Sequence, residues 1–333
     1  MRAWAVHQPG AIETEPLVRV EREMPEPGPT EVRVRVHVCG MCRTDLHLAV
    51  GELAPRRPDV IPGHEIVGVV DACGTTATRF AIGARVGIAW LRHTCGVCTY
   101  CRRGDENLCV SPRFTGWDAD GGYADYAVID EAFAYALPDD FPDEQAAPLL
   151  CSGIIGYRAL RRSRLPAGGR LGIYGFGASA HLAAQIALHE GATVHVLTRS
   201  ESARQLALEL GCASARDAYA APPEPLDAAV LFAPVGELVP VAMRALDRGG
   251  VLSIAGIYLS DIPKVEYERD LFFERTLTST TANTRRDGEE LLRLATTIPL
   301  RVRTVAYQFA DAASALADLA QDRLTGAAVL HIA

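Results

Sequence analysis

The sequence predicts an α/β protein built from two domains, and three observations support this fold class. The chain has 333 residues, 49% of them hydrophobic, and this length exceeds what a single core normally fills. Short β-rich runs bounded by glycine occupy the first 150 residues, whereas strand-like and helix-like segments alternate from about residue 170. Such alternation is typical of parallel βαβ units. We therefore expect a β-rich part followed by a doubly wound parallel sheet.

The predicted elements follow in chain order. Residues 31–38 alternate apolar and polar side chains with the period of a strand, and 66–70 and 84–88 are further β-rich runs. In the second part, strands are expected at 171–174, 193–197, 228–232, 251–255 and 276–281, with helical segments at 182–188, 202–210, 238–246 and 287–296. A last strand is expected at 327–332.

The charge balance argues against two classes of partner. The chain holds 33 basic and 41 acidic residues, a net charge of −8, which repels nucleic-acid phosphates and anionic lipid. No run approaches the roughly 18 apolar residues of a membrane helix, and the first residues lack the apolar region of a signal peptide. We therefore expect a cytoplasmic protein without nucleic-acid or membrane partners, whose nine cysteines form no disulfide.

A cluster of four cysteines predicts a structural metal site. Cys95, Cys98, Cys101 and Cys109 lie within fifteen residues, at spacings that let one compact lobe surround a tetrahedral zinc ion. Four thiolates leave no open coordination position for water or substrate. The chemistry of the protein must therefore be sought elsewhere in the chain.

A glycine turn predicts a nucleotide site. Gly175 and Gly177 follow an apolar strand and precede a helix, and Ala180 takes the place of the third glycine of a dinucleotide fingerprint. In this context, backbone amides and a helix N-terminus approach a pyrophosphate. The alternative is a tight turn in an ordinary βαβ unit, and the surrounding βαβ pattern favours the nucleotide.

The end of the second predicted strand indicates which cofactor binds. An NAD site usually places Asp or Glu there for the ribose hydroxyls, whereas this chain has Thr198, Arg199 and Ser200. Their hydroxyls and guanidinium suit a 2′-phosphate. The sequence thus favours NADP over NAD. In the alternative interpretation, Arg199 is a solvated charge or stacks on adenine in a site that accepts either cofactor.

Three further segments carry a family resemblance. Residues 39–47 read Cys39-Gly-Met-Cys42-Arg43-Thr44-Asp45-Leu-His47, residues 63–65 read Gly-His64-Glu65, and residues 150–153 read Leu-Cys151-Ser-Gly. With the four-cysteine lobe and the glycine turn, they occur in the order and spacing of one family. The chain resembles the zinc-dependent alcohol dehydrogenases of the medium-chain dehydrogenase/reductase superfamily.

The resemblance implies a domain organisation. Residues 1–150 are expected to form a GroES-like catalytic domain with both zinc sites, and 151–283 a Rossmann NAD(P)-binding domain. Residues 284–333 are expected to return to the catalytic domain. Relatives form dimers or tetramers through the edge of the Rossmann sheet, so a homodimer or homotetramer is implied.

The resemblance also implies a reactive zinc site and a proton relay. Cys42, His64 and Cys151 are expected to bind the catalytic zinc, with Glu65 adjoining the metal. Asp45 is expected to fix the tautomer of His64. Thr44 matches the hydroxyl that contacts the alcohol, and His47 matches the imidazole at the end of the relay.

The resemblance extends to the cofactor and substrate. Arg43 matches a position that contacts the pyrophosphate, with a surface charge as the alternative, and Arg285 lies in a loop that faces the cofactor in relatives. Gly326-Ala327 replaces the Gly-Arg of many relatives, so one cofactor contact is missing. Trp90 and Trp117 lie in segments that approach the substrate pocket, which indicates apolar or aromatic alcohols; plain core packing is the alternative.

The implied reaction is the reversible oxidation of a primary or secondary alcohol to an aldehyde or ketone with hydride transfer to NAD(P). Zinc-free quinone reductases of the same superfamily lack the four-cysteine lobe and the Cys, His, Cys set. A zinc-stabilised nucleotide-binding sensor without turnover has no need for the relay residues Thr44 and His47. Both remain rival interpretations of the sequence.

Overall fold

The computed structural model describes residues 1–139, 141–324 and 326–332, and it separates into two compact units. Unit 1 comprises Met1–Cys151, Ala282–Thr297 and Val302–Ala333, and unit 2 comprises Ser152–Thr281 and Ile298–Arg301. The sequence-based division at 150 and 283 contains no counterpart of the short segment 298–301, which leaves unit 1 and returns to it.

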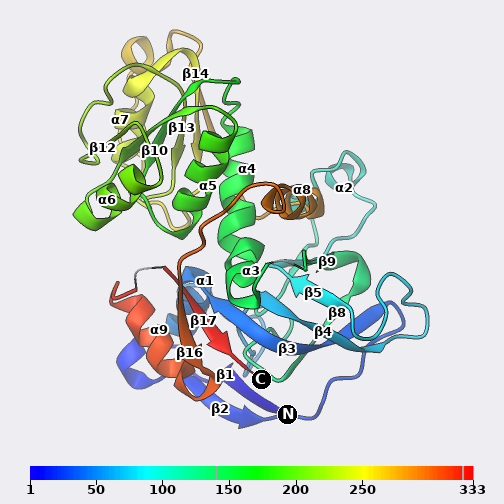
Figure 1. Ribbon diagram of the computed structural model, residues 1–333. Coiled ribbons are helices and arrows are strands. Elements are labelled where there is room, and N and C mark those ends of the chain that lie inside the picture. Colours follow the sequence, from blue (N-terminus) through cyan, green and yellow to red (C-terminus); the bar gives the residue numbers. More distant parts are fainter. Residues whose placement is uncertain (140, 325, 333) are drawn as a thin grey trace. The chain divides into compact units, whose positions relative to one another are not determined.

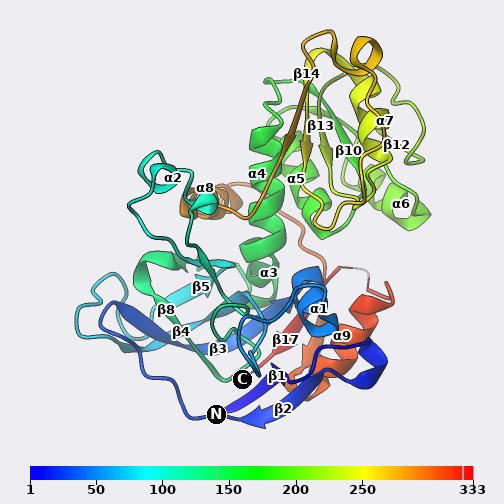
Figure 2. The same cartoon turned by 180° about the vertical axis from the view of Figure 1, so that it is seen from behind.

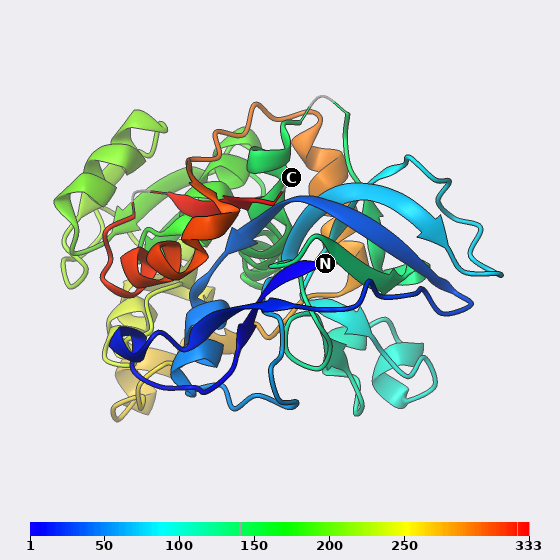
Figure 3. The ribbon, with the colours of Figure 1, turned by 90° about the horizontal axis from the view of Figure 1, so that it is seen from below.

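Unit 1 is built on a seven-stranded sheet within the described chain, ordered β16-β17-β3-β4-β5-β9, with β8 also paired to β3. The strands are β3 (Glu31–Met41), β4 (Glu65–Cys73), β5 (Arg85–Ile88), β8 (Tyr126–Asp130), β9 (Ala134–Ala136), β16 (Thr304–Gln308) and β17 (Ala327–His331). Figure 3 shows the long, curved β3 and β4. Val32, Val34 and Val36 of β3 are completely buried. The apolar side chains of the predicted alternation therefore form the face of the strand that packs into the core.

Smaller elements complete unit 1. Two-stranded sheets pair β1 (Arg2–Val6) with β2 (Leu17–Glu21) and β6 (Leu91–His93) with β7 (Arg113–Phe114). The helices are α1 (Arg43–Val50), α2 (Thr99–Arg102), α3 (Asp143–Pro148), α8 (Arg285–Ala295) and α9 (Ala312–Ala320). The last strand, β17, pairs antiparallel with β3. The C-terminal segment therefore returns to the sheet that contains β3 (Figure 1).

Unit 2 contains a six-stranded parallel sheet, ordered β12-β11-β10-β13-β14-β15 in the described residues. Its strands are β10 (Arg170–Tyr174), β11 (Thr193–Leu197), β12 (Ser214–Arg216), β13 (Leu226–Leu231), β14 (Leu246–Ile254) and β15 (Thr276–Ser279). The chain builds this sheet outward from β10, first through β11 and β12 on one side and then through β13, β14 and β15 on the other. Doubly wound Rossmann folds have this strand order. The predicted fold class is confirmed.

Helices cover both faces of this sheet. They are α4 (Ile154–Arg162), α5 (Ala178–His189), α6 (Glu201–Glu209) and α7 (Leu238–Ala245). In Figures 1 and 2, α7 lies on the face opposite α4 and α5. Its Leu238, Val239 and Met243 pack in one cluster with Tyr174 and Leu231 of the strands. The carboxyl ends of β10 and β11 are thereby held rigid, and these are the ends that the sequence predicts to meet a nucleotide.

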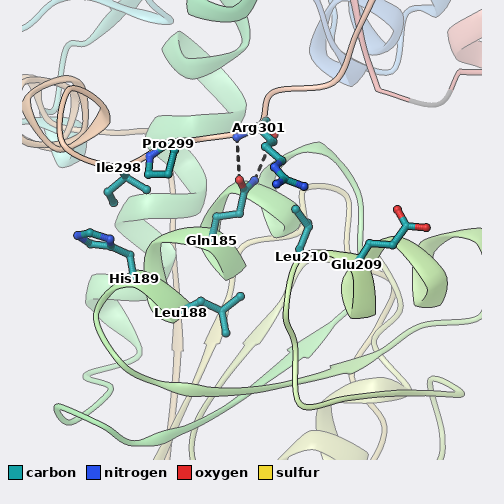
Figure 4. A pocket seen from close by; sticks show the side chains of 8 residues that line it. All are labelled: Gln185, Leu188, His189, Glu209, Leu210, Ile298, Pro299 and Arg301. Atoms are coloured by element: carbon teal, nitrogen blue, oxygen red, sulfur yellow. Dashed lines mark hydrogen bonds between the residues drawn. The ribbon is translucent and has the colours of Figure 1, made fainter.

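The short segment Ile298–Arg301 is fastened to unit 2 by one side chain. The amide of Gln185, on α5, accepts a hydrogen bond from Arg301 N at 2.7 Å and donates to Arg301 O at 3.2 Å. Figure 4 shows this pair beside a cavity of about 210 Å³, which is lined also by Leu188 and Pro299. Gln185 is only 9% exposed, and its Nε2 also donates to the carbonyl of His181, one turn earlier on α5, at 3.1 Å.

Candidate functional site

Four donor side chains from separate parts of unit 1 converge at a buried point. Cys42 is the N-cap of α1, His64 and Glu65 stand at the start of β4, and Cys151 lies in a π-helical turn, Leu149–Gly153. Cys42 Sγ is 3.3 Å from His64 Nε2 and 4.0 Å from Cys151 Sγ. One ligand atom from each of the four lies within 4.8 Å of the others. This is the spacing of ligands around a single metal ion.

Asp45 organises this cluster from behind. One carboxylate oxygen accepts from Cys42 N at 2.9 Å, which caps α1, and the other accepts from Gly63 N at 3.0 Å. Its Oδ1 is also 3.5 Å from His64 Nδ1, and the side chains of both residues are almost fully buried. A single carboxylate therefore holds the loops that carry two of the ligands.

The electrostatics of the cluster favour a bound cation. A hydrogen bond from Cys151, together with the charge of His64, holds the pKa of Cys42 well below its ordinary value despite burial. Burial raises the pKa of Glu65, whose Oε2 has no hydrogen-bond partner among the described residues. Buried anions and an unpaired carboxylate oxygen are costly unless a positive ion compensates them.

Three aromatic rings extend from the ligand His64. Trp90 meets the imidazole edge-on at a centroid distance of 4.9 Å and stacks on Phe114 at 4.9 Å and on Trp117 at 6.0 Å. The Arg56 guanidinium covers the Trp117 ring at 3.6 Å. The structure thus brings together the two predicted tryptophans. Sequence reasoning missed Phe114 and Arg56, because an isolated aromatic or basic residue carries no pattern.

The predicted relay residues lie on the first turns of α1. Thr44 follows the capped N-terminus, with its N–H directed at Cys42 Sγ at 3.4 Å. His47 stands one turn later, and its Nδ1 is hydrogen-bonded to the carboxylate of Glu52. Glu52 is exposed. The sequence analysis missed Glu52, which stands five residues after His47, just beyond the end of the helix.

The four-cysteine lobe forms a second donor cluster. One Sγ atom from each of Cys95, Cys98, Cys101 and Cys109 lies within 4.8 Å of the others. Backbone N–H groups also donate to these sulfurs, including Cys95 N to Cys109 Sγ at 3.2 Å. Hydrogen bonds from the backbone of Cys101 and Val110 lower the pKa of Cys98 to about 6. A thiolate stabilised by backbone donors is ready to bind zinc.

The two donor sets fit zinc in its two common roles. Two thiolates and an imidazole, with a carboxylate adjoining, suit a catalytic ion that keeps a position for substrate, whereas four thiolates form a closed structural site. The residues that would hold the ions are Cys42, His64, Glu65 and Cys151 in the first case and Cys95, Cys98, Cys101 and Cys109 in the second.

The glycine turn in unit 2 has the geometry of a phosphate cradle. Gly175 adopts a positive φ of 83°, and a side chain there would collide with the backbone of Ala233. Gly177 is the N-cap of α5, and the space where its side chain would stand is open. Ala180 is fully buried. The N-terminus of α5 can therefore be approached closely by a pyrophosphate.

The predicted 2′-phosphate residues lie between β11 and α6. Thr198 is buried, Arg199 is exposed, and Ser200 is the N-cap of α6. The Ser200 hydroxyl accepts from Ala203 N at 3.2 Å. One side chain of the three is therefore committed to capping the helix, and the Arg199 guanidinium is exposed to solvent.

The two other predicted cofactor arginines have partners within unit 1. Arg43 forms an ion pair with Asp322. Arg285 binds Glu106, which lies within the four-cysteine lobe, through its guanidinium at 2.7 Å and through its backbone N–H at 2.7 Å. A role for either arginine toward the cofactor stays a prediction. For Arg285, an ion pair with a nearly buried carboxylate competes with that role.

The chain is similar to known proteins over its whole length. The family model for the alcohol dehydrogenase GroES-like domain matches residues 28–139. The probable alcohol dehydrogenase AdhA of Mycobacterium tuberculosis is 56% identical over 337 residues, covering 100% of this chain and 97% of the relative. NADP-dependent alcohol dehydrogenase C of Mycobacterium bovis is 36% identical over 209 residues, 60% of each chain.

A solved structure extends this similarity to the fold. Cinnamyl alcohol dehydrogenase from Sorghum bicolor superimposes with a TM-score of 0.88 at 25% identity, covering 99% of this chain and 97% of its own. In the part of the chain that is described, no helix combines the length and the apolarity needed to cross a membrane.

Two independent findings agree on what kind of enzyme this is. A relative that spans the entire chain shares more than half of its residues. The donor sets for a catalytic and for a structural zinc both assemble in the structure, although the donors of the catalytic set come from distant parts of the sequence. The chain belongs to the zinc-containing medium-chain alcohol dehydrogenases, which are NAD(P)-dependent enzymes.

Proposed function

We propose that this enzyme oxidises primary or secondary alcohols with apolar or aromatic substituents, and that it prefers NADP to NAD. The observation that carries the substrate class is the stack of Trp90, Phe114 and Trp117, which begins at the edge of the ligand His64. Flat apolar rings favour substrates that bury apolar surface and disfavour polyols. The sorghum relative, named for cinnamyl alcohol, agrees with this choice.

The residues of unit 1 divide the work on the alcohol. Bound zinc supplies a Lewis acid that makes the alcohol easier to ionise. Asp45 keeps the His64 ring oriented, because the carboxylate holds both α1 and the Gly63 loop. In this proposal the Thr44 hydroxyl accepts the alcohol proton, and His47, which is hydrogen-bonded to Glu52, passes it to solvent.

The cofactor preference rests on the end of β11. No carboxylate stands at 198–200, where an NAD site would place one for the ribose, and the guanidinium of Arg199 is exposed. A guanidinium matches phosphate oxygens in charge and shape. One relative is named as NADP-dependent. An Arg199→Asp variant is expected to shift the ratio of NADP to NAD specificity toward NAD.

A second copy of the chain is the proposed partner of unit 2. Strand β15 is an edge of the described six-stranded sheet, paired only with β14. Leu277 of β15 is exposed, and so are Tyr267 and Phe272 in the segment that precedes β15. An open edge with apolar neighbours is normally covered. We expect light scattering to give a dimer or tetramer, and Leu277→Glu to lower the mass.

The deciding experiment pairs metal content with turnover. Elemental analysis should find two zinc ions per subunit, and initial rates should show faster oxidation of benzyl alcohol than of ethanol, with NADP⁺ preferred to NAD⁺. Preference for NAD⁺ would discard the argument from Arg199 and keep the enzyme. Two zinc ions without turnover on a broad panel of alcohols and aldehydes would favour the rival, a nucleotide-binding sensor.

A further inference from the structure

The turn between β11 and α6 is held from two sides. On one side, Thr198 N donates to the carbonyl of Arg216, in the neighbouring strand β12, at 2.9 Å. On the other, Ser200 caps α6 through its hydroxyl. Two carbonyl groups, of Thr198 and Arg199, lie between these fixed points. A peptide carbonyl carries partial negative charge, which matters at a place where a phosphate is proposed to bind.

Arg204 takes up both carbonyls. It lies in the first turns of α6, and its side chain folds back so that one nitrogen, Nη1, donates to Thr198 O at 2.9 Å and to Arg199 O at 2.8 Å. Its backbone remains in the helix, donating to Ser200 O at 3.1 Å. Arg204 is half-buried. Both carbonyl oxygens of the turn are therefore directed toward a cation.

We propose that Arg204 is a positioning residue that sets the cofactor preference of the enzyme. By holding both carbonyl oxygens, Arg204 fixes the backbone that presents Arg199 and neutralises the partial negative charge that would otherwise repel a 2′-phosphate. NAD lacks that phosphate, so it gains little from this arrangement. The inference rests on the proposed preference for NADP and adds a residue that no sequence pattern indicated.

The expected size of the effect follows from the bonds involved. A hydrogen bond from a charged donor is stronger than one between neutral groups, and the loss of such a bond commonly changes an equilibrium by about tenfold or more. Removing the guanidinium is therefore expected to lower kcat/KM for NADP⁺ by about tenfold or more. Most of the loss should appear in KM, because the hydride-transfer chemistry lies elsewhere.

The test compares two arginines of the same kind. Arg216, at the end of β12, is exposed and donates from Nη1 to the carbonyl of Ala221 at 2.9 Å. It carries the same charge at the same end of the sheet, but its side-chain hydrogen bond goes to Ala221. A substitution of this side chain leaves the backbone bond from Thr198 N to Arg216 O in place. We would measure kcat and KM for NADP⁺ and NAD⁺ in the zinc-loaded wild type, Arg204→Met, Arg204→Lys and Arg216→Met.

The expected result separates position from charge. Arg204→Met should lose most of the NADP⁺ to NAD⁺ selectivity, Arg204→Lys should recover part of it because an ammonium can still bond a carbonyl, and Arg216→Met should leave it within about twofold. Equal losses in the two Met variants, or unchanged selectivity in Arg204→Met, would overturn the inference. A wild type that prefers NAD⁺ would instead overturn the proposed preference itself, and the inference with it.

Discussion

The two cysteine clusters of unit 1 suit zinc in two different roles, and the fold assembles them in different ways. Cys95, Cys98, Cys101 and Cys109 come from one stretch of fifteen residues, and three of the four are only half-buried. Cys42 and Cys151 are 109 residues apart, and they meet beside the fully buried His64. The first cluster is made by local spacing and holds a lobe together. The second is made by the fold and contains the chemistry.

This difference predicts different consequences of damage. Ligands close together in sequence lose little chain entropy when they gather, so metal binding there mainly orders the lobe. The distant ligands are already positioned by α1, β4 and the π-helical turn, so metal binding there adds reactivity to a scaffold that folds anyway. Loss of the first cluster should be seen as instability, and loss of the second as inactivity.

The largest expected effect is on the buried cluster. Cys42→Ala should lower kcat by at least about a thousandfold, because it removes a ligand of the metal that supplies several kcal/mol of barrier lowering. Circular dichroism and the zinc of the four-cysteine lobe should be unchanged. Cys212→Ala, at a buried cysteine of unit 2 outside both clusters, serves as the control. Turnover within tenfold of the wild type would contradict the assignment.

The next effect should appear in stability. Cys101 Sγ is 3.5 Å from Cys98 Sγ and 4.0 Å from Cys95 Sγ, so Cys101→Ala breaks the closed set. We expect one zinc ion to be lost, the melting temperature to fall by at least about 5 °C and residues 95–109 to become sensitive to protease. If Cys101→Ala lost activity as completely as Cys42→Ala while remaining equally stable, the two clusters would not differ in role.

A smaller effect is expected at the base of the lobe. Glu106 accepts three hydrogen bonds of 3.1 Å or less from the guanidinium of Arg285, and one more from its backbone N–H. Glu106→Gln should lower the free energy of unfolding by about 2 kcal/mol, since it removes a charge that is nearly buried. The control is Glu290→Gln, which breaks an exposed pair with Arg286 on the same helix and should cost less than about 1 kcal/mol.

The smallest effect is expected on proton transfer beside the buried cluster. Glu52→Gln should slow turnover by about fivefold, less than His47→Gln, because it weakens the outer end of the proton path and leaves the imidazole in place. Adding imidazole buffer should restore the rate of either variant by supplying an external base. A rate that does not depend on buffer concentration in both variants would remove the pair from proton transfer.

The sequence predicted the local parts of this molecule better than the assembled ones. The four-cysteine lobe follows from spacing alone, and the βαβ alternation follows from periodicity, as β10, β11 and β13 confirm. The gathering of Cys42, His64 and Cys151 has no signature in spacing, so it depended on the family resemblance. Long-range pairing decides such sites, and a pattern of single residues does not encode it.

Long-range pairing also explains the features that the sequence analysis did not predict. Sequence reasoning left out β16, which is short and pairs with β17, and it left out Glu52 and Phe114, whose partners come from other turns or strands. The Arg285 side chain also takes a distant partner, Glu106, which lies 179 positions earlier in the chain, and its role toward the cofactor stays a prediction. Only the folded chain supplies the partners of such residues.

The two hydrogen bonds between Gln185 and Arg301 limit how this protein can be divided into fragments. A protein cut after Thr281 would contain every strand of the Rossmann sheet, yet it would lack residues 298–301 that belong to the same unit. The amide of Gln185 would lose both bonds to Arg301 and face water, and Leu188 would lose the cover that Ile298 and Pro299 give to the shared cavity. The nucleotide-binding half is therefore not an independent module by sequence. A chimera that moves this half into another enzyme must therefore also include residues 298–301, which are separate from it in the sequence.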